Sequence, residues 1–150
     1  MKKIIVLLLM LTFALSACGG DETDNLPEYP YDDYYNATIT STEVDGSTTV
    51  ITVETIGFHP ANIIIIDVTF KNGTMTNFEV IEHGETPAYG GALIDDKQVL
   101  EAIIEDAVNL DSIEATDYSD IDVTAGSTIT IEAFLDAARA SVKHFNTYYE

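Results

Sequence analysis

The Asn72-Gly73 dipeptide lies between two runs of β-forming residues and is the strongest structural signal in the sequence. Residues 62–70, before it, include four consecutive isoleucines, and residues 74–82, after it, again favour a strand. Asn-Gly is preferred in two-residue hairpin turns because both turn positions take positive φ. The sequence therefore predicts an antiparallel hairpin, and the isoleucine run predicts a strand buried on both faces.

A second hairpin is predicted upstream, with strands at residues 38–44 and 48–56 joined by a tight turn at Asp45-Gly46. Downstream, residues 95–108 have helical spacing, and residues 109–121 are acidic and weakly patterned, which predicts a loop. The face of the first helix is expected to carry Val99, Ala102, Ile103, Asp106 and Ala107.

A last helix is predicted after residue 126, with Ser127 or Thr128 as its N-cap and Glu132 in its first turns. Its buried stripe is expected to consist of Ile131, Phe134, Leu135, Ala138 and Val142. Together these elements predict an α+β fold, in which an antiparallel sheet packs with two helices.

The N-terminus has the features of an export signal. Lys2 and Lys3 precede an apolar block at residues 4–15, which is too short to span a bilayer as a permanent helix. The following Leu15-Ser16-Ala17-Cys18-Gly19 resembles the bacterial lipoprotein signal motif, in which the cysteine becomes the lipidated N-terminus. The alternative is a chance cysteine behind an ordinary secretory signal.

The lipoprotein interpretation divides the chain into a signal peptide at residues 1–17, an acidic tether at residues 18–37 and a domain at residues 38–150. It predicts a protein anchored through lipid on Cys18 to the extracytoplasmic face of the cell membrane. Since Cys18 is the only cysteine, its acylation would leave no thiolate for a metal site or an iron–sulfur cluster.

The charge of the chain excludes one class of partner. The formal net charge is -20, and removal of residues 1–17 takes away two lysines and no acidic residue, which leaves -22. Such a surface repels nucleic acid, so we expect no nucleic-acid partner. It either steers a basic partner protein or simply keeps the domain soluble.

Two loops carry the functional hypothesis, and both are rich in small residues. The first reads His-Gly-Glu-Thr-Pro-Ala-Tyr-Gly-Gly at residues 83–91, and the second is Asp122-Val123-Thr124-Ala125-Gly126-Ser127-Thr128. With the Asn72-Gly73 hairpin before them, they resemble the FMN-binding domain family over roughly residues 50–143. That family includes flavin-carrying subunits of the Rnf and sodium-pumping quinone reductase complexes, and extracellular flavoproteins.

The resemblance implies the cofactor FMN, esterified through its phosphate to Thr128 by a separate flavin transferase that uses FAD. It places Asp122 at the acidic position of the family motif, Gly126 and Ser127 beside the attachment point, and Glu85 and Thr86 in the flavin region. The family's usual Ser-Gly-Ala-Thr is Ala125-Gly126-Ser127-Thr128 here, so Ser and Ala have exchanged places. Ser127 thereby introduces a second hydroxyl beside Thr128.

The implied function is a membrane-tethered flavoprotein electron carrier, rather than an enzyme with its own substrate. Its expected partners are the flavin transferase, a membrane dehydrogenase or quinone-linked redox partner, and the membrane itself. The alternative is a surface lipoprotein of the same fold that acts as a binding or structural module without covalent flavin, and noncovalent FMN binding lies between the two. Glu85 and Thr86 could equally stabilise a structural turn, and Tyr89 could stack on a flavin or pack at the rim.

Overall fold

The computed structural model describes residues 33–58, 63–122 and 127–150. The predicted signal peptide, Cys18, most of the predicted tether and Gly126 lie outside these residues. No helix among the described residues is long and apolar enough to cross a membrane.

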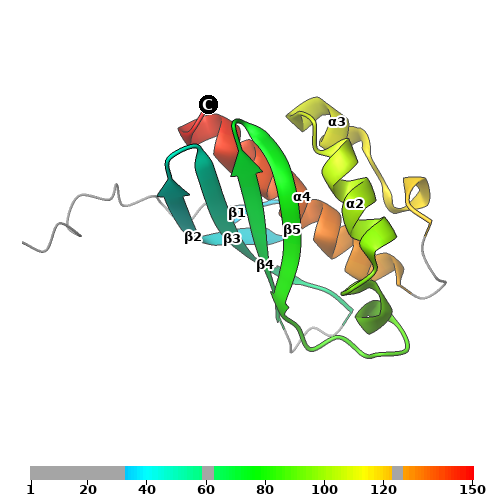
Figure 1. The fold of residues 1–150 in the computed structure, drawn as a ribbon. Coiled ribbons are helices and arrows are strands. Elements are labelled where there is room, and N and C mark those ends of the chain that lie inside the picture. The colour runs from blue at the N-terminus through cyan, green and yellow to red at the C-terminus, as the bar shows by residue number, and fades with distance from the viewer. Residues whose placement is uncertain (1–32, 59–62, 123–126) are drawn as a thin grey trace, which may run out of the picture.

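Four nine-residue strands form an antiparallel sheet: β2 (Ala37–Asp45), β3 (Thr48–Ile56), β4 (Ile63–Lys71) and β5 (Thr74–Glu82). The two-residue β1 (Asp33–Tyr34) is added beside β2, and the strand order is β1-β2-β3-β4-β5. The sheet is open, and β5 is its last strand in the described part of the chain (Figure 1). The α+β class and the strands of both predicted hairpins are confirmed to within one residue at each end.

The second hairpin turns at Asn72 and Gly73, as predicted, with φ of 51° and 84°. Positive φ at both turn positions matches the right-handed twist of the flanking strands. The first hairpin turns at Gly46 and Ser47, one residue later than predicted, because Asp45 still pairs with Thr48 as the last residue of β2; Gly46 has φ of 60°.

The isoleucine strand is buried on one face only, so the prediction of two buried faces is wrong. Ile64 and Ile66 are completely buried, whereas Ile63 is 43% exposed and Ile65 is half-buried. The reason is that the helices gather on one side of the sheet and leave the other side uncovered (Figure 1). Four adjacent isoleucines hide this alternation, because they are apolar at the solvent-facing positions as well.

Two predicted helices are confirmed, as α2 (Lys97–Asp106) and α4 (Thr128–Tyr148). The side chain of Asp96 caps α2 by accepting hydrogen bonds from the N–H groups of Gln98 and Val99. The predicted loop at residues 109–121 instead contains α3 (Leu110–Ala115) and the short 3₁₀ helix η2 (Tyr118–Asp120). Asn109 caps α3 and Ile113 anchors it in the core, but six residues are too few to show a helical period.

Helix α4 lies across the buried face of the sheet and supplies much of the core. Its predicted stripe is confirmed, since the five residues are all at most 3% exposed: Ile131, Phe134, Leu135, Ala138 and Val142. Phe134 packs against Phe78 of β5 with ring centroids 5.8 Å apart, and Phe145 stacks on Phe70 of β4 at 4.4 Å. These contacts hold α4 against β5 and β4.

Candidate functional site

The carboxylate of Glu85 joins three segments at the end of the sheet where β3 ends. Its side chain is 5% exposed, and Oε2 accepts a 2.8 Å hydrogen bond from the hydroxyl of Thr130 in α4. A Cβ on Gly57, just after β3, would lie 2.4 Å from Glu85 Oε1. A Cβ on Gly90 would lie 2.1 Å from Glu85 Oε2, so both glycines are needed for the carboxylate to fit.

Backbone hydrogen bonds close the loop around Glu85. The carbonyl of Thr86 accepts from the N–H groups of Tyr89 at 2.9 Å and Gly91 at 3.0 Å. The exposed His83 also stabilises the loop, because its Nδ1 accepts a 3.3 Å hydrogen bond from the N–H of Glu85. The loop therefore has a defined shape, and the 3₁₀ helix η1 (Gly90–Leu93) continues it toward α2.

Ser127 connects this loop to α4 instead of capping the helix. It occupies the N-cap position, but its side chain makes no capping hydrogen bond, so that part of the prediction is wrong. Its hydroxyl donates to the carbonyl of Tyr89 at 3.2 Å, and the residue is 1% exposed. A buried, engaged hydroxyl is a poor competitor for a modification at Thr128.

Thr128 is the first residue of α4 and is half-buried. No hydrogen bond from another described residue engages its hydroxyl. The side chain at the N-cap does not cap the first N–H groups of α4, and a helix N-terminus favours an anionic group. Asp122 is exposed at the end of the preceding described segment, and Gly126 lies outside the described residues.

Two exposed aromatic rings flank this junction. Phe58, 43% exposed, follows Gly57, and Tyr89, 45% exposed, precedes Gly90. Their ring centroids are 5.6 Å apart and the planes are tilted by 31°. Tyr89 therefore lies at the solvent-facing rim of the junction between this loop and α4, as one of the two alternatives for it predicts. Phe58 was not predicted as a site residue, and its only sequence signal is a large aromatic within a Gly- and Pro-containing break.

A pocket of about 410 Å³ lies beside the first turns of α4. Ile56, Ile129 and Ala133 form its apolar lining, and its polar lining consists of Asn36, Glu132 and Asp136. Its volume lies within the roughly 300–1,000 Å³ typical of ligand pockets. Sequence reasoning missed this lining, because Ile56 ends one predicted strand and Ile129 lies off the predicted helix stripe.

Arg139, the only arginine of the chain, forms ion pairs with the two acidic residues on the polar side of this pocket. Arg139 Nη1 lies 3.0 Å from Asp136 Oδ1 and 3.6 Å from Glu132 Oε2. Asn36 Nδ2 donates to the second oxygen of Asp136 at 2.8 Å. Arg139 also donates to the carbonyls of Ile113 and Thr116, so it ties α4 to α3. The charges of Glu132, Asp136 and Arg139 together leave one net negative charge at the pocket.

No group of histidine, cysteine, aspartate and glutamate side chains among the described residues is arranged to hold a metal ion. The site offers a hydroxyl that no other described residue engages, a helix N-terminus, exposed aromatic rings and a pocket. These are features that suit an aromatic ligand with a phosphate group.

A comparison with protein-family models shows which family the chain belongs to. The model of the FMN-binding domain matches residues 62–143, more than half of the chain. The chain belongs to the FMN-binding domain family. The match begins at β4 and includes both loops and most of α4; it starts later than the predicted residue 50 and ends at the same residue. No curated protein and no solved structure matches the chain.

Family membership indicates a flavin-binding electron-transfer module and implies FMN as its flavin. The structure brings Glu85 and Ser127 to the start of α4, with Thr128 beside them. Thr86 follows Glu85 in the loop, and its carbonyl accepts the backbone hydrogen bonds that close this loop. It adds Thr130, Phe58, Ile56 and Ile129 to the residues that the sequence predicts.

Proposed function

We propose that the protein is a membrane-tethered, extracytoplasmic electron carrier with FMN attached to Thr128 through a phosphoester. The observation that carries this proposal is the position of Thr128 within the family match, as the first residue of α4, with a hydroxyl that no other described residue engages. Bound FMN supplies the electron-transfer chemistry, and the protein supplies attachment, orientation and electrostatics.

Attachment requires only one group of this chain to react. The Thr128 hydroxyl forms a new oxygen–phosphorus bond with the FMN phosphate of FAD, AMP leaves, and a flavin transferase takes up the hydroxyl proton. The first N–H groups of α4 would then stabilise the phosphodiester charge. Glu85, through Thr130, holds the loop against α4 so that this helix end keeps its position.

Two surfaces beside Thr128 suit the flavin ring system. The apolar lining of the adjacent pocket, Ile56, Ile129 and Ala133, would cover part of a bound ring system, and the exposed rings of Phe58 and Tyr89 offer aromatic contacts. Glu132 and Asp136 add negative charge at the pocket. This charge disfavours the anionic reduced form of a flavin bound there and so lowers its reduction potential.

The attachment is tested by expressing the full chain with a flavin transferase and measuring flavin fluorescence of the protein band after denaturing electrophoresis. We expect a fluorescent band for the wild-type chain and none for Thr128→Ala. A dark wild-type band beside a labelled control domain with the standard motif would rule out covalent attachment. Flavin that copurifies with the native protein but is lost on denaturation would identify noncovalent binding instead.

The membrane location rests on the lipoprotein-like sequence around Cys18. On this proposal, lipid on Cys18 anchors the protein outside the cytoplasmic membrane, where a membrane dehydrogenase or quinone-linked protein exchanges electrons with it. Cys18→Ala should move the protein from the membrane fraction to the soluble fraction or leave its signal uncleaved. Unchanged membrane association of a cleaved Cys18→Ala protein would contradict the lipid anchor.

A further inference from the structure

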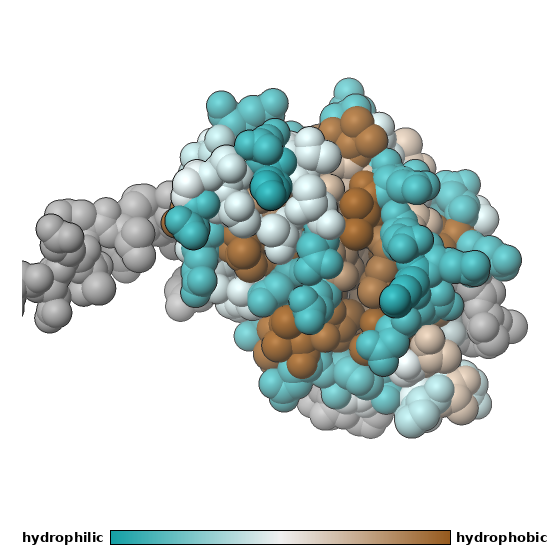
Figure 2. Space-filling view, in the orientation of Figure 1, coloured by the Kyte–Doolittle hydropathy of each residue, from teal (hydrophilic) through white to brown (hydrophobic). Residues whose placement is uncertain are grey.

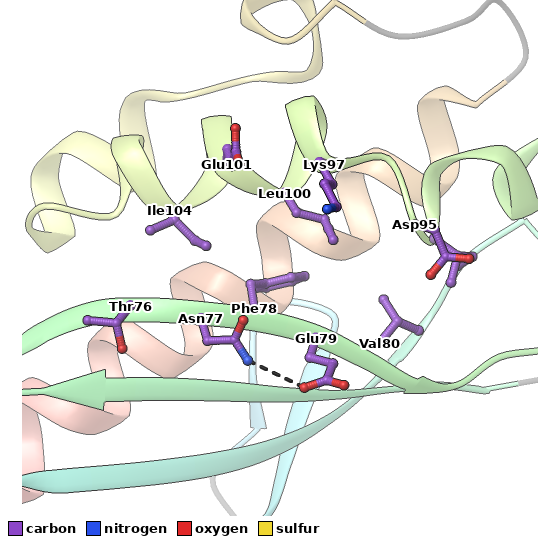
Figure 3. A pocket seen from close by; sticks show the side chains of 11 residues that line it. Thr76, Asn77, Phe78, Glu79, Val80, Asp95, Lys97, Leu100, Glu101 and Ile104 are labelled. Atoms are coloured by element: carbon purple, nitrogen blue, oxygen red, sulfur yellow. Dashed lines mark hydrogen bonds between the residues drawn. The ribbon is translucent and has the colours of Figure 1, made fainter.

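A groove of about 440 Å³ runs between β5 and α2 (Figure 3), and it shares no lining residue with the pocket beside α4. Five consecutive β5 residues, 76–80, form one wall. Lys97, Leu100, Glu101 and Ile104 of α2 form the other. Leu100 and Ile104 point from the helix toward the strand, and Phe78 and Val80 point toward the helix. Figure 2 shows a hydrophobic strip along this boundary.

The strand side of the groove is an open sheet edge. Within the part of the chain that the structure describes, β5 pairs only with β4. Register shifts interrupt the pairing at both sides of residues 77–80, but these four residues pair regularly with β4. The strand contains neither proline nor lysine, two residues that commonly protect an edge. Its outer backbone groups can therefore pair with an added strand.

The charges around the groove restrict what this strand contains. Glu79, Asp95 and Glu101 line the groove, and Lys97 is its only cationic lining residue. Side chains of an added strand would alternate between the two faces of the sheet. One set would face Leu100 and Ile104 of α2, and the other set would lie beside Glu79. The complementary segment alternates aliphatic and basic residues.

We propose that this groove is a docking site for an extended, alternating aliphatic and basic segment of a partner protein, which adds a strand to β5. Main-chain hydrogen bonds would supply affinity, and the α2 wall would select the side chains, as in other cases of strand addition. The chain's own residues 19–33 are acidic and would be repelled. Pairing of β5 with β5 of a second copy would place the Glu79 carboxylates of both copies at the shared edge.

The proposal is tested on the full chain in neutral detergent micelles, with a fluorescein-labelled heptapeptide of alternating valine and lysine as the probe. In an extended strand, the N–H groups of alternate residues point to the same edge. Two further peptides are N-methylated, one at every valine and the other at every lysine. Fluorescence anisotropy gives the affinity of each peptide.

Strand addition predicts that one methylated peptide binds like the parent and that the other binds roughly tenfold more weakly or worse, since it loses several main-chain hydrogen bonds. Equal affinities of the two methylated peptides, whether strong or weak, would overturn the proposal. A further control peptide has the same composition with its lysines grouped at one end. If the parent peptide binds no more tightly than this control, the proposal is also overturned.

A matched pair of variants locates the binding surface. Glu79 and Glu82 are both exposed on β5, but only Glu79 lines the groove. Glu79→Lys should weaken binding of the parent peptide by roughly three- to tenfold, because its charge lies beside the lysines of the added strand and attraction becomes repulsion, whereas Glu82→Lys should change the affinity less. Equal losses for the two variants would show that the peptide binds the acidic surface in general and would overturn the assignment to the groove.

Discussion

At the turn end of the sheet, Gly46 and Gly73 have φ of 60° and 84°, and a Cβ on either would meet nothing within 4 Å. At the site end, where β3 leads into the loop around Glu85, Gly57 and Gly90 have no such backbone requirement. A Cβ there would instead lie 2.4 Å or less from a side-chain oxygen of Glu85 or Thr130. The first pair of glycines permits a backbone conformation, whereas the second pair permits close approach of distant segments.

This difference separates local from long-range determinants of the fold. A two-residue hairpin turn is specified by the residues within it. The site end depends on the hydrogen bond between Glu85 and Thr130, which are 45 residues apart, and on that between Ser127 and Tyr89, 38 residues apart. The four predictions below test whether the two ends respond to substitution as this contrast requires.

The largest effect is expected for Gly90→Ala. Its Cβ would lie 2.0 Å from Thr130 Oγ1 and 2.1 Å from Glu85 Oε2, so the buried hydrogen bond must break or the backbone must move. We expect a loss of about 3 kcal/mol in the free energy of unfolding, measured by urea titration. Gly46→Ala, which faces only backbone strain, should lose about 1 kcal/mol. Equal losses at the two positions would contradict the distinction.

The next largest loss of stability is expected when the hydrogen bond between Thr130 and Glu85 is removed. Thr130→Val removes the donor to Glu85 without changing side-chain volume greatly, and it should cost about 2 kcal/mol because the buried carboxylate loses one hydrogen bond. A double-mutant cycle with Glu85→Ala should give a coupling energy of about 1–2 kcal/mol. Additive losses in the cycle would show that the contact does not join the two segments energetically.

A smaller loss is expected for Ser127→Ala. This variant removes the 3.2 Å hydrogen bond to the Tyr89 carbonyl and should cost about 1 kcal/mol in the free energy of unfolding. Flavin labelling should persist, because Thr128 keeps its hydroxyl. If the folded Ser127→Ala protein is not labelled, Ser127 has a role in modification beyond joining the loop to α4.

The smallest effect concerns Tyr35, a site-end residue that has φ of 58° without being glycine. Partial burial and a hydrogen bond to Glu114 raise the pKa of its phenol from 10.0 to about 12. The neutral phenol is thus favoured in the folded state, so its contribution to stability is present below pH 10 and is lost as the pH rises through about 12. Ultraviolet difference titration, with Tyr35→Phe to assign the signal, should show this pKa fall in Glu114→Gln.

Local patterns in the sequence were sufficient for most of the fold. The Asp45-Gly46 and Asn72-Gly73 signals predicted the hairpins, and apolar spacing predicted α2 and the buried stripe of α4. Helix α3 was missed because six residues carry too short a period, and one-sided burial of β4 was missed because isoleucine occupies both faces.

The candidate site was predictable only through the family motif. That motif pointed to Thr128 and to the loop at residues 83–91, but no local pattern connects Glu85 with Thr130 or Ser127 with Tyr89. Phe58 and Ile56 reach the site because β3 ends beside α4, which requires the sheet order and the helix packing to be known. Spatial neighbours of this kind come from the tertiary fold, not from residue spacing.

Mass spectrometry of the chain expressed with a flavin transferase tests the central claim, that Thr128 at the start of α4 carries FMN. The account predicts a mass increase equal to one FMN less one water, with fragmentation placing it on Thr128. It also predicts that Thr128→Ala abolishes the increase while Ser127→Ala retains it. FMN on another hydroxyl, or an unmodified chain beside a fully modified control domain, would contradict the claim.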